Sequence, residues 1–163
     1  MNKNRIKSRG LSNLQLAGKD LQDQISDYKF SEENNISFSF KLEKKLIMFI
    51  KELVLAKISE SVEYYNFNES SAVREGISLL RKNKPLQQRP DEISNPTKRG
   101  RKSTLAPGII KVNTSFLISE ADREYIYNFI YHKQKGGGRF TKEEFFCELV
   151  KELSNQYNIE VKA

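Results

Sequence analysis

The sequence contains very few of the residues from which small proteins build disulfides and metal centres. Its 163 residues include one Cys, one His and no Trp. One Cys excludes an internal disulfide framework, and a single Cys with a single His excludes zinc-finger spacing. The most apolar stretch, residues 46–58, is interrupted by Lys51, Glu52 and Lys57, and no run reaches the roughly 18 residues of a membrane span. We therefore expect no metal, no cofactor and no membrane insertion.

Positive charge is in excess. The chain has 28 Lys and Arg against 21 Asp and Glu, a net charge of +7, whereas residues 110–163 are neutral overall. An excess of this size favours an anionic partner, and nucleic acid is a common one, although many basic proteins bind none. The basic N-terminal residues are not followed by an apolar stretch, which argues against a secretory signal. We expect a cytoplasmic location.

Proline is confined to one part of the chain and divides it. All four prolines, Pro85, Pro90, Pro96 and Pro107, lie among Gln, Asn, Ser, Lys and Arg. Proline fixes φ and removes a backbone donor, so this stretch is predicted to be a basic linker over residues 84–109. The other predicted segments are a basic tail with a short helix (1–35), two organised units (36–83 and 110–157) and a C-terminal tail (158–163).

The first unit changes its hydrophobic period from two to that of a helix. Residues 36–42 alternate strictly between apolar and polar side chains, which predicts a strand with one buried face. A helical stripe follows, and a second helix is predicted from about Ser70. The stripe consists of Leu46, Phe49, Ile50, Leu53, Val54 and Ile58.

The second unit repeats this order. Residues 111–118 are rich in β-branched side chains and predict a second strand. Ser119 is a good N-cap for the helix that follows, and the three glycines at 136–138 end that helix. Thr141 and Glu144 have the spacing of a capping box at the start of the last helix. The chain is thus predicted to be mainly α-helical with two short strands.

Neither strand can satisfy its edge groups alone, so we expect the two to pair as an antiparallel ribbon backed by four helices. Such a ribbon fits the major groove of B-DNA. The face expected to pack on the helices consists of Ile36, Phe38, Phe40, Leu42, Val112, Thr114, Phe116 and Ile118.

This arrangement resembles the ribbon-helix-helix family of DNA-binding proteins, the Arc/MetJ type. The stretch 68–81, NESSAVREGISLLR, is similar to the start of the family's second helix, with a Ser-rich cap followed by apolar, Arg, Glu, small and apolar residues. Residues 140–146 take the same place in the second unit with a weaker match. The resemblance implies a tandem pseudodimer, as in some accessory proteins of conjugative relaxosomes.

The resemblance also implies which residues contact DNA. Base readers would be the outward side chains of the ribbon: Ser37, Ser39, Lys41, Lys111, Asn113 and Ser115. Phosphates would be held at the N-termini of the second helices by Ser70 and Ser71 in one unit, and by Thr141 with Arg139 in the other.

Three features depart from the family pattern. Leu117 would also point outward, which is unusual for a base reader. The first strand ends without a Pro, Ser or Thr cap, and the helix after it is about two turns longer than is usual in the family. Because the two units are not interchangeable, any operator they read should be asymmetric.

The linker carries a second DNA-binding signature. Arg99, Gly100 and Arg101 resemble an AT-hook core, in which each Arg lies along a narrow A·T minor groove. The usual Pro after the second Arg is replaced by Lys102. A solvated basic linker is the alternative interpretation.

No catalytic arrangement is evident in the sequence, so we expect no enzyme activity. The function predicted is sequence-specific binding of double-stranded DNA, as a plasmid transfer or partition accessory factor. Self-association, or contact with a relaxase or partition protein, would accompany that role. The alternatives are a transcriptional repressor of the same fold, a helical protein-interaction module and an RNA-binding regulator.

Overall fold

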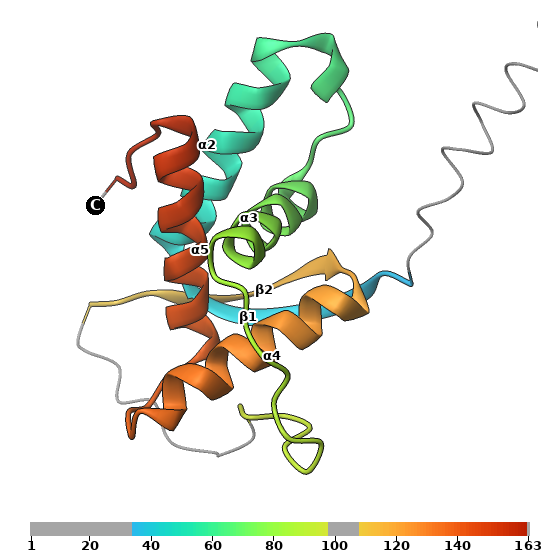
Figure 1. Cartoon of the computed structure of the whole chain (residues 1–163). Coiled ribbons are helices and arrows are strands. Elements are labelled where there is room, and N and C mark those ends of the chain that lie inside the picture. The colour runs from blue at the N-terminus through green and yellow to red at the C-terminus, as the bar shows by residue number, and fades with distance from the viewer. Residues whose placement is uncertain (1–33, 98–107, 163) are drawn as a thin grey trace, which may run out of the picture. The chain divides into compact units, whose positions relative to one another are not determined.

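The computed structural model of the chain describes residues 34–97 and 108–162. Of the basic tail and short helix predicted over residues 1–35, residues 1–33 therefore lie outside the described residues. In the described part, two strands and four α-helices are present (Figure 1). The elements are β1 (Ile36–Glu43), α2 (Lys44–Glu60), the 3-10 turn η2 (Val62–Tyr64), α3 (Glu69–Asn83), β2 (Lys111–Ile118), α4 (Glu120–Lys135) and α5 (Lys142–Tyr157). The expected mainly helical fold with a two-stranded antiparallel sheet is confirmed.

The two strands pair along their full length, side by side in Figure 1, although 67 residues separate them in the sequence. Ser39 is opposite Ser115, Lys41 is opposite Asn113 and Ser37 is opposite Leu117. Alternation with period two sends Phe38, Phe40, Leu42, Phe116 and Ile118 into the core, each no more than 5% exposed. The expectation that Val112 packs there too was wrong: it is 42% exposed, although its cross-strand partner Leu42 is fully buried.

Helix α2 buries a lysine where an isoleucine was expected. Leu46, Phe49, Ile50 and Leu53 are buried as the helical stripe predicts, but Ile58 is 40% exposed and its neighbour Lys57 is 7% exposed. The expectation for Ile58 was therefore wrong. A spacing of four continues the stripe from Leu53 to Lys57 on the same face.

Aromatic rings explain why a lysine is tolerated there. The Lys57 ammonium lies 4.1 Å from the ring centroid of Tyr157 and 4.5 Å from that of Tyr64, with Phe67 at 5.9 Å. Ring faces carry negative potential, which attracts a cation by about 0.5–2 kcal/mol depending on its exposure. The cage joins α2, η2 and the last turn of α5.

Helix α3 packs closely on α5. Its N-cap is Asn68, whose side-chain oxygen accepts the N–H of Ser71 at 3.0 Å. A Cβ added at Gly76 would lie 2.6 Å from Leu149 Cγ and 3.1 Å from Leu153 Cδ1, both on α5. Only a glycine allows this distance, so the helices of residues 36–83 and 110–157 share one core.

Both helices of the second half begin with the caps that the sequence predicts. Ser119 and Asp122 form a capping box on α4, and Thr141 and Glu144 form one on α5. Each pair satisfies two N–H groups that the helix itself cannot. Arg81 of α3 also binds Asp122 at 2.7 Å, which fastens α3 to the start of α4.

The described part of the predicted linker, residues 84–97, is anchored to α4. Arg89 is 8% exposed. Its guanidinium donates to the carbonyls of Ile93 (2.7 Å) and Ser94 (2.9 Å) and to Asn128 Oδ1 (2.8 Å), and it pairs with Glu124 at 2.8 Å. Proline prevents regular structure here but leaves carbonyl acceptors that this arginine uses.

Candidate nucleic-acid interface

The outer face of the ribbon is a row of exposed side chains, most of them polar. Alternation with period two places these side chains on one face of the ribbon and the buried phenylalanines on the other. The pattern that forms the core therefore also forms this surface. Five of the six predicted base readers are exposed on it: Ser37, Ser39, Lys41, Asn113 and Ser115. Leu117 lies on the same face and is 51% exposed, as its position in the alternation predicts.

Two serine hydroxyls meet at the middle of this face. The Oγ atoms of Ser39 and Ser115 are 2.8 Å apart and form a hydrogen bond. The Ser39 carbonyl is bound by Lys142 and the Leu117 N–H by Ser70, so these backbone groups point to the outer edges of the ribbon. The backbones of Ser39 and Ser115 therefore exchange no hydrogen bond with each other, although their side chains do. In a pair of this kind the Cα atoms approach to about 4.5 Å.

The sixth predicted reader, Lys111, is occupied by an ion pair. Its ammonium lies 2.5 Å from Glu143 Oε2, with both side chains under 20% exposed. The other oxygen of Glu143 accepts the backbone N–H of Glu43 at 3.1 Å. One carboxylate of α5 thus holds the ends of both strands, and Lys111 would have to leave it before it could contact a base.

The N-terminus of α3 lies against the edge of β2. Ser70 Oγ accepts the N–H of Leu117 at 2.9 Å, and the Ser71 hydroxyl donates to the Asn68 cap at 3.2 Å. Both predicted phosphate-binding hydroxyls therefore already have a protein partner. Because the cap serves the N–H of Ser71, the N–H groups of Glu69 and Ser70 have no acceptor within the helix and can receive an anion.

The N-terminus of α5 lies against the opposite edge, at β1. Lys142 Nζ donates to the Ser39 carbonyl at 3.2 Å and lies 4.1 Å from the ring centroid of Phe38. Partial burial lowers the pKa of Lys142 from its usual 10.5. Thr141 is the N-cap, and Arg139 is exposed just before it. Two helix N-termini thus flank the ribbon, one at each edge.

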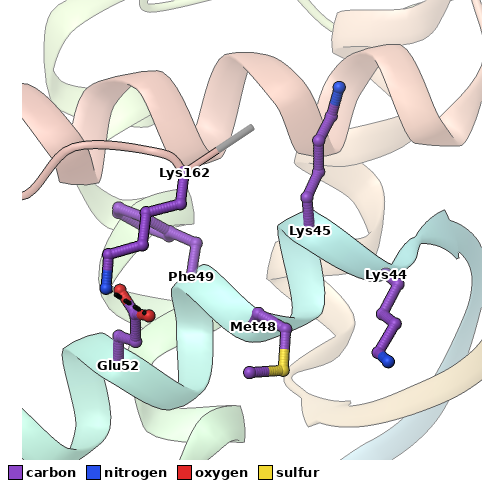
Figure 2. A pocket seen from close by; sticks show the side chains of 6 residues that line it. All are labelled: Lys44, Lys45, Met48, Phe49, Glu52 and Lys162. Atoms are coloured by element: carbon purple, nitrogen blue, oxygen red, sulfur yellow. Dashed lines mark hydrogen bonds and ion pairs between the residues drawn. The ribbon is translucent and has the colours of Figure 1, made fainter.

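Lysines also gather where β1 passes into α2. Lys44 and Lys45 are exposed on the first turn of α2 and point away from each other (Figure 2). They line a pocket of about 360 Å³ together with Met48, Phe49, Glu52 and Lys162. Its one carboxylate, Glu52, is paired with Lys162 at 2.8 Å. The pocket holds no nucleophile with a neighbouring base, so we assign it no catalytic role.

Sequence reasoning missed three contributors to this surface. Asn68 is the cap of α3, which the Asn immediately before the helix could have indicated. Lys142 fastens α5 to the ribbon, and Glu143 holds Lys111; both contacts need the tertiary fold and carry no local signal. The predicted minor-groove residues Arg99, Gly100 and Arg101 lie outside the described residues.

The geometry is suited to contact with a polyanion over several residues. Exposed amide, hydroxyl and ammonium groups on a narrow ribbon can hydrogen-bond base edges, and flanking helix N-termini can receive phosphates. Within residues 34–97 and 108–162, no three His, Cys, Asp or Glu side chains come together as metal ligands would. In the same ranges, no helix combines the length and the apolar content that crossing a membrane requires.

Comparison of the chain with protein-family models, with curated proteins and with solved structures gives no match.

Proposed function

We propose that the chain is a sequence-specific double-stranded DNA-binding protein of the ribbon-helix-helix type, in which one chain supplies both units. The observation that carries this proposal is the ribbon itself. It presents exposed polar side chains to solvent between two helix N-termini, and its buried face rests on the helices. The major groove is about 12 Å wide and admits a two-stranded ribbon.

An internal correspondence between the two halves supports the pseudodimer. Ser39 and Ser115, which are hydrogen-bonded to each other, are 76 residues apart. The N-caps of α2 and α4, Glu43 and Ser119, have the same offset. An antiparallel pair of equivalent strands has one pair of equivalent residues facing each other, and here that pair is the two serines. A pseudo-twofold axis would pass between them.

Charge and chemistry favour DNA over other anionic partners. Lys41 can donate to guanine O6 and N7, and Asn113 can bind adenine N6 and N7 with two hydrogen bonds. The net charge of +7 supplies the general attraction to phosphates. RNA fits less well, because the A-form major groove is too narrow for side chains to read.

The biological role that we propose is that of an accessory factor for plasmid transfer or partition. Unequal units joined in one chain suit an asymmetric site in an origin region, whereas a repressor of palindromic operators needs only identical subunits. The same fold would serve a transcriptional repressor. Footprinting on the DNA upstream of its own gene, and on any linked transfer origin, distinguishes the two.

The experiment that tests the binding function is selection of duplexes from a random pool, followed by affinity measurements on the enriched sequence. We expect specific binding that weakens steeply with salt. Lys41→Ala or Asn113→Ala should each reduce affinity for the selected duplex about 5- to 150-fold, the value of one good base contact, and leave weak binding to random DNA. Lys51→Ala, which removes an exposed lysine from α2 behind the ribbon, is the matched control.

The alternatives predict different outcomes. A protein-interaction module would enrich no sequence and would bind random duplex negligibly at low salt. An RNA regulator would prefer a structured RNA competitor to the duplex. Either result would contradict the proposal.

A further inference from the structure

The outer face of the ribbon has two chemically different ends. On one side of the Ser39–Ser115 pair, Lys41 is opposite Asn113. On the other side, Ser37 is opposite Leu117. The first end carries a cation and an amide, and the second carries a hydroxyl and an exposed isobutyl group.

Leu117 is held in place although its side chain is exposed. Its neighbours Phe116 and Ile118 are 1% and 0% exposed, which fixes the strand on the core. Its N–H is bound by Ser70 at 2.9 Å, which fixes the backbone at the outer edge. The side chain is therefore presented from a rigid position at 51% exposure, on the same face as the polar readers.

The offset of 76 residues that relates the two halves makes Leu117 the counterpart of Lys41. Both residues precede the N-cap of the following helix by two positions. Ser37 corresponds in the same way to Asn113. The two ends of the ribbon thus hold equivalent sequence positions about the central serines and present different side chains.

We propose that the ribbon reads two unlike half-sites of DNA and that Leu117 recognises thymine, an inference that rests on the proposed function. The Lys41–Asn113 end would bind guanine and adenine through their major-groove hydrogen-bonding groups. The Ser37–Leu117 end would bind an A·T pair, with Leu117 packed on the C5-methyl of thymine, the apolar group that the major groove displays.

The spacing of the two contacts follows from strand geometry. Lys41 lies four positions after Ser37 on β1, which is about 13 Å at roughly 3.3 Å per residue. Base pairs follow each other at about 3.4 Å along the helix axis, and the path along the groove is somewhat longer. The purine contacts and the thymine contact should therefore lie about three or four base pairs apart.

Replacing thymine by deoxyuridine tests the assignment, because this removes only the C5-methyl. The probes are the selected duplex and versions of it with one thymine at a time replaced. For the wild-type protein we expect one position, three or four base pairs from the purine contacts, where deoxyuridine weakens binding about fourfold, the effect of one buried methyl. For Leu117→Ala the two duplexes should bind equally. Val112→Ala, which shortens another exposed aliphatic side chain of β2 on the opposite face, should keep the discrimination.

A second variant tests whether the two ends are equivalent in position. Ser37→Asn with Leu117→Lys gives both ends the same readers. This double variant should prefer a palindrome of two copies of the Lys41–Asn113 half-site, and the wild type should prefer the original asymmetric site. Thermal unfolding followed by circular dichroism verifies that the variants are folded.

The two failures are distinguishable. If Leu117→Ala still discriminates thymine from deoxyuridine, or if no thymine is sensitive, the assignment of Leu117 is overturned and sequence-specific binding stands. If the double variant keeps the asymmetric preference, the correspondence of the two ends is overturned. If no duplex is enriched at all, both the inference and the proposed function fall.

Discussion

The hydroxyl oxygens of Ser39 and Ser115 are 2.8 Å apart across the centre of the ribbon. The contact marks the register of the two strands. The hydrophobic pattern enforces that register, because a slip by one residue would turn Phe38 and Phe40 to solvent and place polar side chains in the core. Every assignment of side chains to the outer face depends on this register.

The register can be tested with a designed disulfide. Ser39→Cys with Ser115→Cys, in a Cys147→Ser background, should close under mild oxidant, because non-hydrogen-bonded pairs bring Cβ atoms to the distance that a disulfide needs. Mass spectrometry of the oxidised and reduced protein measures the fraction closed. Ser39→Cys with Asn113→Cys, one pleat out of register, should close poorly, and equal closure of both would contradict the pairing.

Arg139 should act on affinity and not on sequence preference. It is exposed just before the cap of α5, where a phosphate would be received. Arg139→Gln should weaken binding to all duplexes by a similar factor and lower the slope of log K against log salt by about 0.9, the contribution of one phosphate contact.

Affinities measured at several salt concentrations give this slope. Lys151→Gln removes the same charge from the exposed side of α5 and is the control. An equal change of slope for both variants would show that only net charge matters.

Gly76 should not tolerate a methyl group. Alanine would favour the helix by about 1 kcal/mol, but its Cβ would lie 2.6 Å from the fully buried Leu149. Overpacking of a core costs typically about 1–3 kcal/mol, so after the gain in helix propensity Gly76→Ala should lower the free energy of unfolding by up to about 2 kcal/mol.

Urea denaturation measures the change. Gly138→Ala is the control, because nothing lies within 4 Å of its added Cβ. A Gly76→Ala variant more stable than the wild type would contradict the close approach of α3 and α5.

Much of the fold follows from local sequence patterns. Alternation predicted the first strand and β-branched residues the second, both to within a residue, and Ser119 and the pair Thr141–Glu144 cap their helices as the sequence predicts. Alternation also predicted that Leu117 points outward. Such features depend on neighbours in the chain, which is why the sequence reveals them.

Two buried cations were not predictable in this way. Lys57 is buried because Tyr64 and Tyr157 surround its ammonium, and Arg89 because Asn128 and Glu124 of α4 receive its guanidinium. Their partners lie up to 100 residues away in the sequence, so no local pattern distinguishes these residues from exposed ones. The ion pair of Lys111 with Glu143 escaped prediction for the same reason.

Glu75 should make stability depend on pH. Burial raises its pKa above the usual 4.5, against the opposing effect of the Lys57 ammonium, and the Tyr157 hydroxyl donates to its carboxylate. A raised pKa in the folded state means that the contribution of Glu75 is full below pH 4.5 and is lost as pH rises through the raised value. Glu75→Gln preserves the shape of the side chain and is neutral at every pH.

The free energy of unfolding of the wild type minus that of Glu75→Gln should therefore fall as pH rises above about 4.5 and level off once pH exceeds the raised pKa. Urea titrations at several pH values measure this difference. A difference that does not change with pH, or that rises, would contradict the burial of this carboxylate.

The most direct test of the account is to map the surface that contacts DNA. Amide chemical shifts of ¹⁵N-labelled protein, followed during titration with the selected duplex, report each residue separately. The account predicts the largest changes over residues 37–41 and 113–117, with further changes at the first turns of α3 and α5. Changes confined to Leu55 on α2 and Val62 at the start of η2, with the ribbon unaffected, would contradict it.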